Sequence, residues 1–200
     1  MSLPAVTVLL DLRAEVVWPA LPADAAMQCT EIIRTTIARV GLHGAFEVSL
    51  VITGDAQMRR INRRFRGIDT TTDVLSFPQS AAPLLALPPQ ERWVTRPFGD
   101  DAHDQPFADD ALPVAAAAPE SPAHAAPAGS EPYHVGDIII AAPTVERQAA
   151  EAGHGAWWEC CFLVAHGTLH LLGYDDYYAP GYHAMVAHQG AVLAALGMRR

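Results

Sequence analysis

The chain is organised around residues 164–176, which read VAHGTLHLLGYDD. Apolar residues surround the two histidines of this stretch, so it predicts a helix that is buried nearly all round and central to the fold. On a helix His166 and His170 lie about 40° apart around the axis and about 6 Å apart along it. Both imidazoles can therefore reach the same metal ion.

A candidate third ligand follows this helix. Gly173 comes three residues after His170, where a left-handed residue would end the helix and turn the chain back. Asp176 could then bring a carboxylate to the same point, with the adjacent Asp175 as its rival. Three protein ligands leave a fourth position open, which is typical of catalytic rather than structural zinc.

The two histidines allow two other interpretations. A lone histidine in an apolar helix is usually a core residue, but a pair on one face followed by glycine and a carboxylate favours a metal site. The spacing also resembles that of metzincin proteases, which need a glutamate directly after the first histidine as general base. Gly167 occupies that position, so the sequence excludes proteolysis in that form.

Length and composition predict one domain, because 200 residues that are 50% hydrophobic suffice for a single buried core. The cysteines at positions 29, 160 and 161 form no disulfide framework or paired metal-binding spacing. We therefore expect buried thiols in a reducing compartment, the cytoplasm. Asp11 interrupts the short apolar run near the N-terminus and no basic region precedes it, so we expect neither a signal peptide nor a membrane span.

Charge is unevenly distributed along the chain. The net charge is −9, but residues 80–132 alone contain eight acidic residues and two arginines. Of these 53 residues, 24 are alanine or proline, and this composition predicts a mobile insertion at about 80–132. By contrast, five of the thirteen arginines lie within residues 59–66. Such a dense basic patch is compatible with local phosphate recognition.

Hydrophobic periodicity predicts an α/β (α+β) domain in which helices cover a small mixed sheet. Strands are expected at 5–12, 46–52, 74–77 and 136–140, the first of them buried because it barely alternates. Helices are expected at 25–40, from Thr53 or Asp55 onward, and at 144–152, 156–172 and 180–196. In the second helix the expected buried stripe is Met58, Ile61 and Phe65, and Asn62 falls on the polar face.

Three blocks of this sequence resemble the bacterial YbeY family of metal-dependent endoribonucleases. They are HGTLHLLGYD from His166, INRRFRGIDTTTDVLSFP from Ile61, and Gly136-Asp137-Ile138. The blocks occur in the family's order within roughly residues 54–185, and the insertion lies outside the resemblance. The family pattern usually ends in a third histidine, at the position of Asp176.

The resemblance implies a metal site and an arginine with a catalytic role. The metal would be one zinc ion per chain, or another divalent ion because of the aspartate, held by His166, His170 and Asp176. Arg66 maps onto the functional arginine of the family, and the planar fork of a guanidinium suits phosphate.

Four further residues are candidates around this site. Arg59 and Arg63 share a helix face with Arg66 and would bind RNA with it. Asp137 could orient a ligand histidine or cap the edge of a strand, and Asp175 could orient the turn.

The implied function is cleavage of single-stranded RNA during ribosomal RNA maturation, near the 3′ end of the small-subunit RNA, and in ribosome quality control. Implied partners are ribosomal RNA, small-subunit ribosomal proteins and an assembly GTPase, with no membrane. The nucleophile stays open between water and the RNA 2′-hydroxyl. Two alternatives are a non-catalytic ribosome-assembly factor with a zinc site and a metal hydrolase of small phosphoesters.

Overall fold

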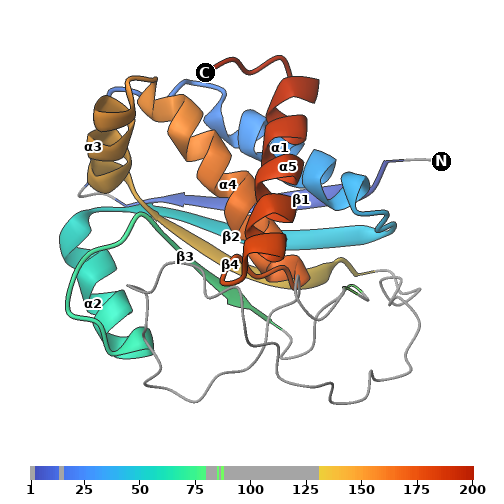
Figure 1. The fold of residues 1–200 in the computed structure, drawn as a ribbon, viewed down its shortest axis with the longest axis horizontal. Coiled ribbons are helices and arrows are strands. Elements are labelled where there is room, and N and C mark those ends of the chain that lie inside the picture. Colours follow the sequence, from blue (N-terminus) through green and yellow to red (C-terminus); the bar gives the residue numbers. More distant parts are fainter. Residues whose placement is uncertain (1–2, 14–15, 80–84, 86, 88–130) are drawn as a thin grey trace.

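The computed structural model of the chain describes residues 3–13, 16–79, 85, 87 and 131–200 (Figure 1). These residues form one four-stranded sheet in the order β1-β2-β4-β3. Its strands are β1 (Ala5–Leu12), β2 (Ala45–Thr53), β4 (Tyr133–Ala141) and β3 (Val74–Pro78). β1, β2 and β4 run parallel, whereas β3 pairs with β4 in the antiparallel direction. The sheet is therefore mixed, as predicted.

The described residues also form five helices. They are α1 (Ala25–Arg39), α2 (Asp55–Arg66), α3 (Ala142–Ala152), α4 (Ala156–Leu172) and α5 (Ala179–Ala195). α4 contacts β3 and β4 as well as α1, α3 and α5. Figure 1 shows α1, α4 and α5 on one side of the sheet and α2 on the other. This arrangement confirms the predicted fold class, with the histidine-bearing helix at its centre.

α4 lies unusually close to the sheet at Gly167. A Cβ atom placed there would lie 3.0 Å from both Ile138 Cγ2 and Ser76 Oγ. A larger side chain would push α4 away from β3 and β4, because packed interiors leave little free space. Gly167, which stands where metzincin proteases have their glutamate, is thus a contact point between α4 and the sheet.

Gly136 makes a second close approach, on the strand next to α4. Its φ is +146°, and a Cβ atom there would lie 2.3 Å from the backbone oxygen of Phe77. No side chain fits at that distance, so glycine is required for β3 and β4 to pair at this point. The Gly-Asp-Ile block therefore begins with a residue fixed by backbone packing.

Two sequence predictions about burial were wrong. β1 is an edge strand, and Leu9 on its outer face is 49% exposed. An apolar run does not reveal whether a strand has one neighbour or two. In α2, Met58 is buried but Phe65 is 46% exposed, and Asn62 is only 2% exposed. The Asn62 amide donates a 2.9 Å hydrogen bond to the Thr70 carbonyl and so holds the loop that follows the helix.

Most of the predicted insertion at 80–132 lies outside the described residues. Leu85 and Leu87, near its beginning, are described, and both pack against the cluster formed by Leu169, Tyr174 and Met185. This part of the segment belongs to the core. Within the described ranges, no helix combines the length and the hydropathy needed to cross a membrane.

Replacing residues 88–129 with a short Gly/Ser linker should preserve folding. β3 and β4 are paired neighbours, and the Gln79 backbone N–H bonds to Val135 at 2.9 Å, so the new loop closes between adjacent strands. The entropy of closing a loop also changes slowly with its length. We expect an apparent Tm within a few degrees of the parent, measured by circular dichroism.

The matched control is a deletion that starts at Ser80. It also removes Leu85 and Leu87, whose partial burial contributes on the order of 1 kcal/mol each. It should unfold at a clearly lower temperature than the shorter deletion. Insoluble protein from the shorter deletion would contradict the prediction.

Candidate metal centre

The two histidines emerge at the last turns of α4, and the turn after the helix is closed by glycine. Gly173 has a φ of +110°. Its N–H bonds to the His170 carbonyl, and the Tyr174 N–H bonds to the Leu169 carbonyl, both at 3.0 Å. This pair of bonds is the Schellman motif, which reverses the chain at a helix C-terminus. The reversal carries Asp176 back beside the helix, as the position of Gly173 predicts.

The structure brings His166, His170 and Asp176 together. The Nε2 atoms of the histidines are 2.9 Å apart. The carboxylate oxygens of Asp176 lie 3.7 Å from His166 Nε2 and 3.8 Å from His170 Nε2. Two ligands of a tetrahedral zinc ion lie about 3.3 Å apart, given metal–ligand lengths near 2 Å. The donor atoms thus have the spacing that a metal ion requires, after shifts of a few tenths of an ångström.

Hydrogen bonding sets the tautomer of His170. Its Nδ1 atom lies 2.9 Å from the carbonyl oxygen of Tyr174. A carbonyl only accepts, so Nδ1 carries a proton, and the tautomer that fits this bond has its lone pair at Nε2. That lone pair points at the space shared with His166 and Asp176, which is the form a metal ligand needs.

The electrostatics of His166 favour its neutral state. Burial, together with the neighbouring His170, lowers the pKa of His166 to about 4, although Asp176 acts in the opposite direction. The imidazole is therefore uncharged near neutral pH. Asp176, with its side chain 39% exposed, lies at the open side of the group.

The remaining carboxylates proposed from sequence lie elsewhere. Asp175 accepts a 3.1 Å hydrogen bond from the Tyr177 N–H, which stabilises the turn locally. Asp137 lies near His134, with 3.8 Å between Oδ1 and Nε2. Because side chains alternate along a strand, Asp137 faces away from α4, whereas Ile138 faces it. The suggestion that Asp137 orients a ligand histidine is corrected, since the Tyr174 carbonyl holds His170.

Sequence reasoning missed a network behind the turn. The Tyr174 side chain is buried, and its hydroxyl lies 3.3 Å from His188 Nε2. On the other side, Arg39 Nε donates to His188 Nδ1 at 3.2 Å. The network links the turn that follows α4, which carries Tyr174 and Asp176, to α5 and α1. Residues so far apart in sequence carry no local signal that would have predicted it.

The arginines lie at α2, on the other side of the sheet. Arg59 forms a two-point ion pair with Asp69, with hydrogen bonds of 2.9 and 2.8 Å, and Arg63 lies 3.7 Å from the same carboxylate. Arg66 is the last residue of α2. Its neighbour Phe65 packs on Phe77 of β3, with ring centres 5.1 Å apart. The end of α2 therefore meets one face of β3 while α4 covers the other.

The cysteines do not add a ligand to this centre. Cys29, Cys160 and Cys161 are all buried and unpaired. Burial raises the pKa of the Cys29 thiol to about 12 and that of Cys160 well above its usual range. Thiolates bind metals and thiols bind them poorly, so these side chains act as small apolar core groups. Among the described residues, His166, His170 and Asp176 are the one group able to hold an ion.

Comparison with known proteins agrees with the three sequence blocks. The family model for endoribonuclease YbeY matches residues 20–197. A protein named endoribonuclease YbeY from Moorella thermoacetica is 38% identical over 169 residues, which are 84% of this chain and 85% of that protein. Its namesake from Roseiflexus castenholzii is 34% identical over 185 residues, or 90% of this chain and 91% of that one. Another, from Chloroflexus aggregans, is 36% identical over 155 residues, or 77% and 76%.

Proposed function

The chain belongs to the YbeY family of endoribonucleases, and from this premise we propose that it is a metal-dependent enzyme that cleaves single-stranded RNA. The observation that carries the metal dependence is the convergence of two imidazole nitrogens and one carboxylate at the end of α4. Three ligands leave a fourth coordination position for water or substrate, as in catalytic zinc sites.

We propose zinc, one ion per chain, as the metal, because two imidazoles and a carboxylate suit its ligand preferences. A zinc ion bound there would supply a water molecule of lowered pKa and would polarise a phosphoryl oxygen. His166 and His170 would hold the ion through Nε2, and the Tyr174 carbonyl would keep His170 oriented. Asp176 would complete the set from the open side.

For RNA binding we propose that Arg66 contacts phosphate and takes part in catalysis. Arg66 lies at the end of α2, on the other side of the sheet from the candidate metal centre. RNA that contacts both would therefore have to pass around edge strand β3. Arg59 and Arg63 would add positive charge beside it. The Arg59 guanidinium already pairs with Asp69 at two points, so its contribution is electrostatic attraction unless that pair opens.

The biological substrate that we propose is ribosomal RNA, cleaved near the 3′ end of the small-subunit RNA and during quality control of ribosomes. Small-subunit ribosomal proteins or an assembly GTPase would act as partners, and the cytoplasm as the location. The buried, unpaired cysteines agree with a reducing compartment. Depleting the protein in cells and sequencing the small-subunit RNA ends tests this proposal. Fully mature 3′ ends after depletion would reject it.

The role of Asp176 can be tested against that of its neighbour. Asp176→Ala should weaken zinc binding at least about tenfold, because it removes a charged ligand, whereas Asp175→Ala should change only the turn. Asp176→His should keep zinc and lower the pH at which cleavage rises, since a neutral ligand leaves more positive charge at the ion. Isothermal titration and pH–rate profiles provide the measurements.

The reverse pattern would reassign the ligand. If Asp175→Ala lost zinc and Asp176→Ala did not, the carboxylate ligand would be Asp175.

The parent protein should cleave a single-stranded oligoribonucleotide faster than a small phosphodiester. A preference for the small compound would favour a phosphoesterase instead.

A further inference from the structure

α4 carries an aromatic ring at every fourth position from its first turn to its end. The rings belong to Trp158, Phe162, His166 and His170, which we call the ring stripe. Successive members turn by about 40°, so they follow one side of the helix. The ring centres of Trp158 and Phe162 are 5.5 Å apart with planes inclined at 18°, and those of His166 and His170 are 4.5 Å apart. The stripe therefore leads directly to the candidate metal ligands.

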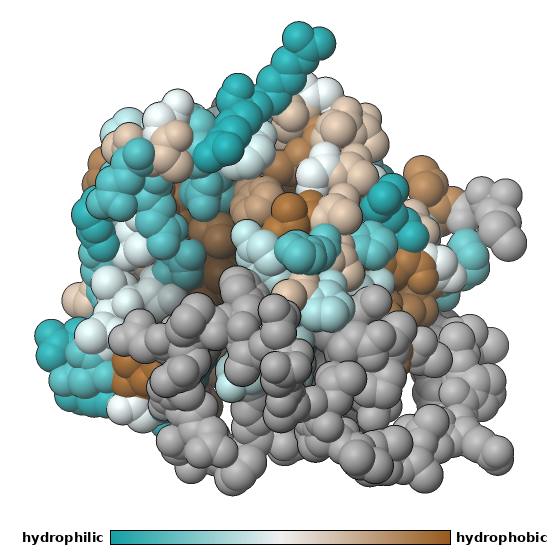
Figure 2. All heavy atoms as spheres, in the orientation of Figure 1, coloured by the Kyte–Doolittle hydropathy of each residue, from teal (hydrophilic) through white to brown (hydrophobic). Residues whose placement is uncertain are grey.

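The ring stripe is the accessible side of the helix. From Cys160 to Leu172, the half-buried residues of α4 are Phe162, His166 and His170, and every other residue is buried. The exposed side of a packed helix is normally polar. Here that side consists of rings. Figure 2 shows a recess with apolar side chains on the face of the molecule where α4 lies.

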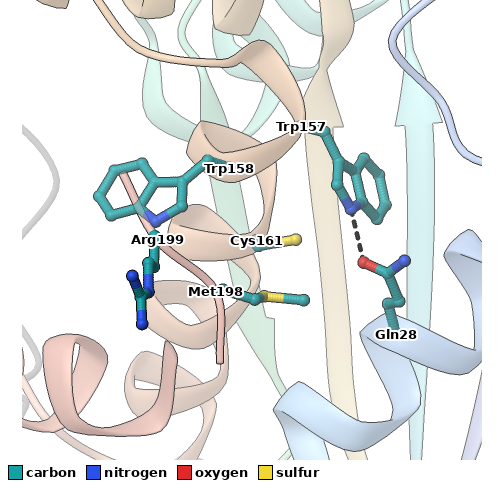
Figure 3. A pocket seen from close by; sticks show the side chains of 6 residues that line it. All are labelled: Gln28, Trp157, Trp158, Cys161, Met198 and Arg199. Atoms are coloured by element: carbon teal, nitrogen blue, oxygen red, sulfur yellow. Dashed lines mark hydrogen bonds between the residues drawn. The ribbon is translucent and has the colours of Figure 1, made fainter. Parts of the chain in front are cut away.

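The far end of the stripe borders a pocket and already holds one planar group. Trp158 lines a pocket of about 150 Å³, and the other lining residues are Gln28, Trp157, Cys161, Met198 and Arg199 (Figure 3). The guanidinium carbon of Arg200 lies 5.6 Å from the centre of the Trp158 ring. A planar cation thus already occupies the ring face, by cation–π attraction. A nucleobase is also planar and could take that place.

The charges around this end suit a polyanion. Arg199 and Arg200 lie beside Trp158. Glu159, the acidic residue next to Trp158 in sequence, is paired with His154 at 3.1 Å, and its side chain is 15% exposed. An RNA phosphate would therefore meet two arginines, while the adjacent acidic group is largely shielded.

We infer that the ring stripe is a stacking platform for the bases of single-stranded RNA on one side of the cleaved bond. This inference rests on the proposed function and adds where the substrate lies. Unpaired bases stack on aromatic side chains with little regard to sequence. Bases on Phe162 and Trp158 would position the strand so that its phosphate reaches His166, His170 and Asp176. Duplex RNA, whose bases are already stacked, would gain nothing from the stripe.

Fluorescence anisotropy with labelled oligoribonucleotides of about ten nucleotides, within the usual size of single-strand sites, tests the inference. Trp158→Leu and Phe162→Leu each keep an apolar side chain and remove the ring. We expect each to raise the Kd about tenfold, and to raise KM for cleavage with kcat and zinc content unchanged. Trp158→Phe keeps an aromatic ring, so this variant should bind the oligonucleotide with a Kd within about threefold of the parent.

Tyr182→Leu is the matched control. Tyr182 is an aromatic residue of α5 that is 43% exposed and belongs neither to the stripe nor to the pocket beside Trp158, so its replacement should leave the Kd unchanged. If the parent cleaves the oligonucleotide and both leucine variants bind it equally well, the platform is wrong and the proposed function stands. If the parent neither binds nor cleaves single-stranded RNA, both are overturned. Equal affinity for duplex RNA would also contradict the platform.

Discussion

His166→Ala should reduce bound zinc to a small fraction of one ion per chain and slow RNA cleavage by at least about a hundredfold. The estimate is a lower bound, because loss of a group that only supports a ligand already costs about 10- to 100-fold. The fold should survive. The side chain of His166 is 19% exposed, alanine is a better helix former, and the lost burial costs on the order of 1 kcal/mol.

Metal analysis by mass spectrometry, together with single-turnover cleavage, provides the measurement. His183→Ala is the matched control, because this exposed histidine of α5 is outside the candidate centre. It should keep both zinc and activity. A His166→Ala protein with unchanged zinc content would show that His166 and His170 are packing residues and not metal ligands.

Arg66→Lys should lower cleavage roughly ten- to hundredfold while leaving stability unchanged. Lysine keeps the positive charge but loses the two parallel N–H donors that match phosphate oxygens, and the loss of one catalytic donor costs about a hundredfold or more. The side chain of Arg66 is exposed, whereas Met58 and Asn62 are the buried residues of α2. The helix should therefore pack as before.

The division of this effect between kcat and KM locates the arginine. A lower kcat would mean that Arg66 contacts the phosphate being cleaved, and a higher KM alone would mean that it holds a flanking phosphate. Arg60→Lys, on the same helix and hydrogen-bonded to Gln57, is the control and should cleave normally. Normal cleavage by Arg66→Lys would leave Arg66 as part of a solvated face.

Local patterns explain what could be predicted from the sequence. Helical spacing placed His166 and His170 on one side of α4, and the position of Gly173 predicted the turn that returns Asp176. The alternation of β2 likewise predicted its buried face. In each case one element's geometry decides the outcome, because the period of a helix or strand is fixed by its backbone.

The wrong predictions all depend on neighbours. β1 is an edge strand only because of the sheet order, and Asn62 is buried because the loop carrying Thr70 covers it. Asp137 faces away from α4 because its neighbour Ile138 faces the helix. Leu87 packs against the cluster that contains Tyr174, and His188 lies beside the Tyr174 hydroxyl. Both contacts join segments that are distant in sequence. Tertiary contacts of this kind leave no periodic signal in a single sequence.

The central claim is that this endoribonuclease needs a metal ion held at the end of α4. The most direct measurement is cleavage of a defined single-stranded RNA by protein stripped of metal with a chelator, followed by addition of zinc. We predict that stripping abolishes cleavage and that about one equivalent of zinc per chain restores it in the parent, but not in His166→Ala. Undiminished cleavage by the stripped protein, or equal restoration in His166→Ala, would contradict the claim.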